Sequence, residues 1–146
     1  MKRIDWIIHY CTNGTCDECG YEETRFIDYA CNAHTHGMEK YGHMDFQIVL
    51  GYDAVTIAYV LNSLGLKVQA GQHFHAGDYV SGIFEDCDVR LDEYQETDRT
   101  VLRVIVPDGN NIFPEDQRCM KKYKHQILET DLLLRNEECN AKSYKD

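Results

Sequence analysis

Apolar residues recur at intervals of three and four positions over residues 53–64, and this spacing predicts an amphipathic helix. The apolar positions of this helix are Ala54, Ile57, Ala58, Leu61 and Leu64. Asp53 is a favourable N-cap residue, and Gly65 stands where helices commonly end. We therefore expect a helix at 53–64 with one face buried in the core.

Most other apolar segments show either alternation or the short continuous runs that are typical of β-strands. The expected strands are 4–10, 24–36, 46–50, 66–70, 79–84, 86–94 and 100–106. The segment 46–50 is almost continuously apolar, which indicates burial on both faces. In 86–94 apolar and charged positions alternate, as in an antiparallel strand with one face in water.

A partial apolar stripe near the end of the chain predicts a second helix, over about 115–134. Pro114 followed by two acidic residues suits the first turn of that helix. Strands dominate, with one inserted and one terminal helix, so the expected fold class is α+β with a mostly antiparallel sheet. The polar tail at 137–146 is expected to fray.

The chain has 146 residues, which is the size of a single domain, 1–146. Its formal net charge of −10 would repel phosphate backbones and anionic membranes, so we expect neither nucleic acid nor membrane as a partner. Apolar runs long enough for a signal peptide or a membrane span are lacking, which favours a cytoplasmic protein. A small-molecule ligand and homo-oligomer formation are both compatible with this composition.

Two pairs of histidines have the spacing of metal ligands. Residues two apart in a strand point to the same face, so His34 and His36 could chelate a zinc-type ion together. His73 and His75 repeat the spacing, and His43 is a further candidate ligand. A site of three histidines with an open position could activate water for hydrolysis. The alternative is that these histidines are loop residues bonded to carbonyl groups.

A cysteine-rich loop is expected at 11–20. Cys16 and Cys19, followed by a glycine, resemble a zinc knuckle, and Cys11 and Cys31 could complete a set of four thiolates. The acidic residues between Cys16 and Cys19 oppose thiolate formation, so a reduced loop or a redox-active pair are the alternatives. The seven cysteines of the chain cannot all pair with one another, which favours thiols or metal ligands over disulfides.

Several motifs resemble, in the right order, the bacterial family called domain of unknown function 4262. The resemblance covers about residues 25–125, and its motifs lie at 34–38, 42–50, 61–62, 68–77, 104–108 and 113–119. Many members have Tyr-Thr-Ile-Gly-Leu at the position of 34–38, so His34 and His36 would belong to a subgroup. Glu115 also stands where many members have Trp. The family has no established activity, so the resemblance implies a fold-level grouping and no reaction.

These observations predict a transition-metal binding protein with a histidine cluster, with zinc as the expected ion and hydrolysis as the chemistry within reach. A non-catalytic interaction or small-ligand module with a structural zinc loop of cysteines is the alternative. A thiol-based redox protein is the third hypothesis, and no catalytic residue can be named from the sequence.

Overall fold

The computed structural model describes residues 3–12, 27 and 29–133. Within them, six strands form one sheet in the order β1-β2-β3-β6-β5-β4. The strands are β1 (Ile7–Thr12), β2 (Ala30–His36), β3 (Phe46–Leu50), β4 (Tyr79–Val80), β5 (Val89–Glu96) and β6 (Arg99–Ile105). The helices are α1 (Ala54–Gln69) and the 3-10 segments η1 (Met38–Tyr41), η2 (Lys121–Ile127) and η3 (Thr130–Leu132).

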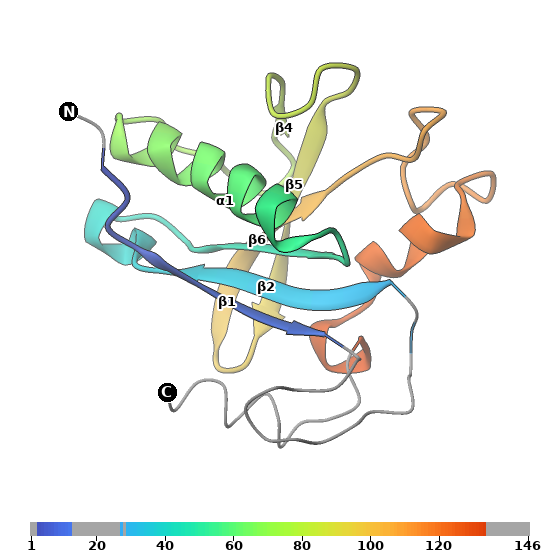
Figure 1. The fold of residues 1–146 in the computed structure, drawn as a ribbon, viewed down its shortest axis with the longest axis horizontal. Helices are drawn as coiled ribbons and strands as arrows, with labels where there is room; N and C mark the ends of the chain where they lie inside the picture. The colour runs from blue at the N-terminus through green and yellow to red at the C-terminus, as the bar shows by residue number, and fades with distance from the viewer. Residues whose placement is uncertain (1–2, 13–26, 28, 134–146) are drawn as a thin grey trace.

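The sheet is mostly antiparallel, and its one parallel pair among these strands is β3 with β6. The helix α1 lies in the connection that leads away from β3 and crosses one face of the sheet (Figure 1). Its buried side packs with apolar residues of β2, β3, β5 and β6 in a single core cluster. The α+β fold class is therefore confirmed. Among the described residues, no helix has the length and apolar character to cross a membrane.

The inserted helix is longer than its apolar spacing predicts. It runs from Ala54 to Gln69, so the strand expected at 66–70 is wrong. The Asp53 carboxylate accepts a hydrogen bond from the Thr56 N–H at 2.8 Å, which confirms the N-cap. Val68 continues the buried face of the helix one turn beyond Leu64, and this burial outweighs its preference for a strand.

Gly65 does not end the helix, because its missing side chain serves packing instead. A Cβ atom built on Gly65 would lie 2.5 Å from Cζ2 of Trp6. The indole of Trp6 lies on the helix at this point, and its Nε1–H donates to Asn62 Oδ1 at 2.8 Å. The close approach of the indole therefore requires glycine here.

The helix expected at 115–134 is replaced by two 3-10 segments, η2 and η3, separated by an extended Leu128. A tertiary contact explains this difference. The Gln126 amide donates to the Val106 carbonyl and accepts from the Val106 N–H, both at 2.8 Å. The side chain thus binds the backbone just beyond β6 as a neighbouring strand would, which holds the segment out of an α-helix.

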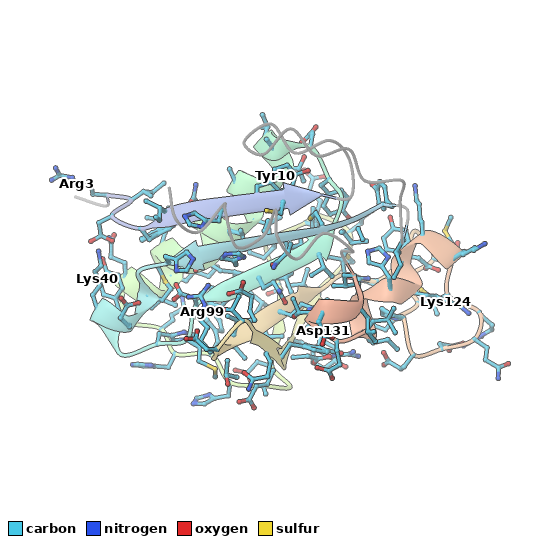
Figure 2. The ribbon with its side chains drawn as sticks, turned by 90° about the horizontal axis from the view of Figure 1, so that it is seen from below. Arg3, Tyr10, Lys40, Arg99, Lys124 and Asp131 are labelled. Carbon is cyan, nitrogen blue, oxygen red and sulfur yellow. The ribbon has the colours of Figure 1, made fainter. Side chains whose placement is uncertain are left out.

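The sheet face opposite α1 carries an unusual number of buried polar side chains. Asn32, His34, Gln47, Glu96 and Arg103 are all at most 3% exposed. The segments η2 and η3 contribute contacts to this face, and Figure 2 labels Lys124 and Asp131 on them. All five residues of β3 are buried, which confirms the prediction that this strand is covered on both sides.

The Trp6 contact makes a counterintuitive stability prediction. Gly→Ala in a helix interior normally stabilises by about 1 kcal/mol, because alanine is the better helix former. We expect Gly65→Ala instead to lower the free energy of unfolding by about 1–3 kcal/mol, as in overpacked cores. Chemical denaturation of wild type and variant measures the difference. In a Trp6→Leu background the clash is absent, so the same substitution should be neutral or stabilising; equal destabilisation in both backgrounds would contradict the packing explanation.

Candidate metal centre

Three histidines converge on the sheet face opposite α1. The antiparallel register of β1 and β2 places His9 directly opposite His34, and His36 follows two residues later on the same face. Each of the three offers one ring nitrogen, and these nitrogens lie within 4.8 Å of one another. The ring centroids are 4.6 Å apart for His9 and His36, 5.0 Å for His34 and His36, and 5.6 Å for His9 and His34.

The environment of His34 and His36 favours neutral imidazole rings. His34 is 1% exposed, while His9 and His36 are half-buried. Burial, together with the positive charge of Arg99, lowers the pKa of His34 to about 2. Burial and Arg99 also lower the pKa of His36. Metal ligation requires the neutral ring, so His34 and His36 are in the ligating state at neutral pH.

The residues of the cluster fit a small transition-metal ion. Zinc–nitrogen bonds of about 2.0–2.1 Å place two nitrogens on one ion no more than about 4 Å apart. The present nitrogen separations reach at most 4.8 Å, so small side-chain rotations would complete the contact. Three imidazole ligands with an open fourth position are also the arrangement of several zinc sites that activate water.

One ring nitrogen of His34, Nδ1, faces polar groups that can fix the orientation of the ring. His34 Nδ1 lies 3.0 Å from Asn32 Oδ1 and 3.7 Å from a carboxylate oxygen of Glu96. Ligating histidines usually bond their other nitrogen to an amide, carbonyl or carboxylate group, which fixes the direction of the ring. His34 therefore has the support that a metal ligand needs.

Arg99, labelled in Figure 2, ties the β5–β6 hairpin to β2 beside the cluster. Its guanidinium donates to Glu96 at 2.9 Å, to Asp45 at 2.7 Å and to the Thr35 carbonyl at 2.9 Å. Asp45 also accepts from the Thr35 hydroxyl at 2.7 Å and from the Met38 N–H at 3.0 Å. Both carboxylates are thus committed to structural contacts, and neither is a free general base.

The other three predicted histidines do not join His34 and His36. His43 lies between two backbone groups: Nδ1 is 2.8 Å from the Met44 carbonyl, and Nε2 accepts from the Phe74 N–H at 2.9 Å. His73 stacks on His43 with a centroid distance of 5.9 Å, and His75 is exposed beside Asp78. Within the described ranges, His9, His34 and His36 form the group of side chains whose geometry could hold a metal ion.

The structure places Cys11 and Cys31 on opposite faces of the sheet. Cys11 pairs in register with Asn32 and shares its face, whereas Cys31 lies in the core beside α1 and donates its S–H to the Leu50 carbonyl at 3.1 Å. Burial raises the pKa of the Cys31 thiol strongly. Cys16 and Cys19 lie outside the described residues, so a zinc site involving them stays a prediction.

His9 is the member of the cluster that the sequence does not single out. Its only sequence signal is its position in the expected strand 4–10, which alternates too weakly to show a functional face. Its partner is fixed by the register of β1 against β2, and a long connection between strands does not determine that register.

Comparison of the chain with protein-family models, with curated proteins and with solved structures gives no significant match. The resemblance to domain of unknown function 4262 therefore stays a prediction. The chemistry of the site rests on the geometry of its own residues.

The lowered pKa values predict how stability depends on pH. Unfolded histidines take up a proton near pH 6.5, whereas folded His34, His36 and the buried His125 resist protonation. The unfolded state then binds more protons below pH 6.5, so the free energy of unfolding falls as the pH is lowered. The buried His34 should contribute a loss of about 1 kcal/mol between pH 6.5 and 5.5.

Urea denaturation of the metal-free protein at the two pH values measures this loss. His34→Gln should reduce it, while His75→Gln, at an exposed position, is the matched control and should leave it unchanged. A loss of the same size in His34→Gln and wild type would contradict the assignment.

Proposed function

We propose that this protein binds a transition-metal ion of the zinc type through His9, His34 and His36. The observation that carries the proposal is the convergence of three imidazole nitrogens within 4.8 Å from two hydrogen-bonded strands. The lowered pKa values of His34 and His36 support it, because these rings need not lose a proton before they bind.

The ligand set narrows the class of ion. Three nitrogen donors without a carboxylate suit Zn²⁺, Cu²⁺ or Ni²⁺ better than Mg²⁺ or Ca²⁺, which prefer oxygen ligands. A three-coordinate site leaves a position for water, whose pKa a bound zinc ion lowers. Hydrolysis is the reaction such a water would perform. Because Asp45 and Glu96 are held by Arg99, metal binding is better supported than catalysis.

Zinc titration of protein purified without a histidine tag tests the proposal. We expect one ion per chain at this site, and a decrease of at least about 100-fold in affinity for His9→Ala, His34→Ala or His36→Ala, since each removes a ligand. Competition with a fluorescent chelator measures the affinity, and elemental analysis gives the stoichiometry.

The matched control is the double variant His73→Ala, His75→Ala, which removes two other histidines and should bind zinc like wild type. A Cys16→Ser, Cys19→Ser background separates any ion held by the cysteines from the one at the histidine cluster. Unchanged zinc affinity of His9→Ala in that background would rule out the proposed site.

The alternative function, a small-ligand module, is supported by a different observation. A hollow of about 660 Å³ lies around the segment after β4. Its walls include four aromatic and three acidic side chains, Tyr59, Tyr79, Phe84, Phe113, Glu85, Asp86 and Asp88. No lysine or arginine lines it, and within the described part of the chain these acids form no ion pair. Arg90 lies over the Phe113 ring, 4.9 Å from its centroid, so the other aromatic faces beside the carboxylates are the ones that favour an organic cation.

Choline and its neutral isostere 3,3-dimethylbutan-1-ol distinguish a cation site from a merely apolar one. We expect choline, and not the alcohol, to shift the backbone amide resonances of 81–88. Tyr79→Leu should weaken choline binding about two- to five-fold, as expected for an exposed cation–π contact. Asp131→Asn removes a carboxylate at an exposed position on η3 that does not line the hollow, so it is the control and should bind choline like wild type. Equal shifts with both probes would contradict this alternative.

A further inference from the structure

The buried side chain of Arg103 provides the starting point. It is 0% exposed, and its guanidinium lies 3.6 Å from the ring centroid of Tyr94. Its donors reach Gln47 Oε1 at 2.7 Å, the Gln126 carbonyl at 2.6 Å and the Leu128 carbonyl at 2.5 Å. A fourth contact runs to the Thr130 hydroxyl at 2.9 Å. None of these hydrogen-bond partners is a carboxylate, so the arginine charge is buried without a direct ion pair among them.

Arg103 stands in a row of side chains that crosses four strands. The registers pair His9 with His34, His34 with Gln47, and Gln47 with Arg103. Asn32 lies two residues before His34 on the same face and completes the hydrogen-bonded chain between Gln47 and His34. Hydrogen bonds between buried side chains therefore connect Arg103 to the histidine cluster.

The donors and acceptors in this chain fix one another. A guanidinium can only donate, so the Gln47 atom that faces it is the oxygen. The Gln47 nitrogen then points to Asn32 and lies 2.9 Å from Oδ1, which must be an oxygen because an amide nitrogen can only donate. His34 Nδ1 lies 3.0 Å from that same oxygen and must carry a hydrogen.

We propose that Arg103, acting through Gln47 and Asn32, holds His34 as the Nδ1–H tautomer, so that Nε2 is the ring nitrogen that carries the lone pair a metal ion would need. Arg103 and Gln47 are positioning residues, because neither belongs to the histidine cluster. The value of this tautomer for metal binding rests on the proposed function, whereas the tautomer itself is a property of the metal-free protein. We call the hydrogen-bonded chain Arg103–Gln47–Asn32–His34 the relay. His34 Nε2 is shielded from solvent, so the relay determines whether a buried nitrogen carries the proton.

The substitution Gln47→Glu reverses the relay while keeping the shape of the side chain. A carboxylate beside Arg103 is ionised, and it gains an ion pair that compensates the arginine charge. Its second oxygen cannot donate to Asn32 Oδ1, so the Asn32 amide must turn its nitrogen toward it. The turn relieves an acceptor–acceptor contact of 2.9 Å, and it sets Asn32 Oδ1 against Glu96 in place of Nδ2, at the longer distance of 3.5 Å. His34 Nδ1 then faces a donor and must accept, which moves its proton to Nε2.

Long-range ¹H–¹⁵N correlation spectra of the metal-free protein at neutral pH report which ring nitrogen of His34 carries the proton. We expect Nδ1–H in wild type and Nε2–H in Gln47→Glu, with a decrease of about 10–100-fold in zinc affinity for the variant. Gln95→Glu makes the same chemical change at an exposed position of β5 and should leave both readouts as in wild type.

A wild-type spectrum with Nε2–H would overturn the relay without any variant, and so would a folded Gln47→Glu protein that retains Nδ1–H. The two proposals fail separately. If the tautomer switches as expected but wild type binds no zinc, the relay stands and the proposed function falls. If zinc binds at the three histidines and the tautomer does not depend on Gln47, the proposed function stands and the relay falls.

Discussion

The row of side chains His9, His34, Gln47 and Arg103, which crosses β1, β2, β3 and β6, is the constraint on which the candidate centre depends. A slip of one residue between any two strands would turn one member to the opposite face and break the row. The opposite face is the apolar core beneath α1, so a slip would also bury polar groups there. The same hydrophobic burial that selects the fold therefore selects the alignment of the polar row.

Sequence patterns predict the elements of this fold where local periodicity and burial agree. Segment 46–50 is a strand with the expected bounds, because its continuous apolar run matches burial on both faces. Segment 66–70 is helical although its alternation suggests a strand, since tertiary packing of Val68 decides its state. Local rules predict that the helix ends at Gly65. The residue lies inside α1 instead, because the indole of Trp6, which is distant in sequence, occupies the space of a side chain at this position. Such contacts between distant residues leave no local signal.

The candidate site shows the same division between local and distant information. His34 and His36 could be found because two residues of one strand share a face. His9 could not, since its place depends on strand register. His43 matches the composition of a metal site, yet both of its nitrogens contact backbone groups, and backbone partners are invisible in a list of side chains. Residue type therefore predicts chemistry only where the fold leaves the ligating atom available.

Placement of the cluster on β1 and β2 also indicates what a bound ion would do. β1 lies at the end of the strand order among the described strands, and a terminal strand has a neighbour on one side only. An ion shared by His9 with His34 and His36 would link this strand to the next one through side chains, and binding to the folded state alone stabilises that state. His9 and His36 are half-buried as residues, but His9 Nδ1 and His36 Nε2 are shielded from solvent, as His34 Nε2 is. An ion at this place would therefore act first as a buried link between β1 and β2, and solvent would reach it only after the side chains around it move.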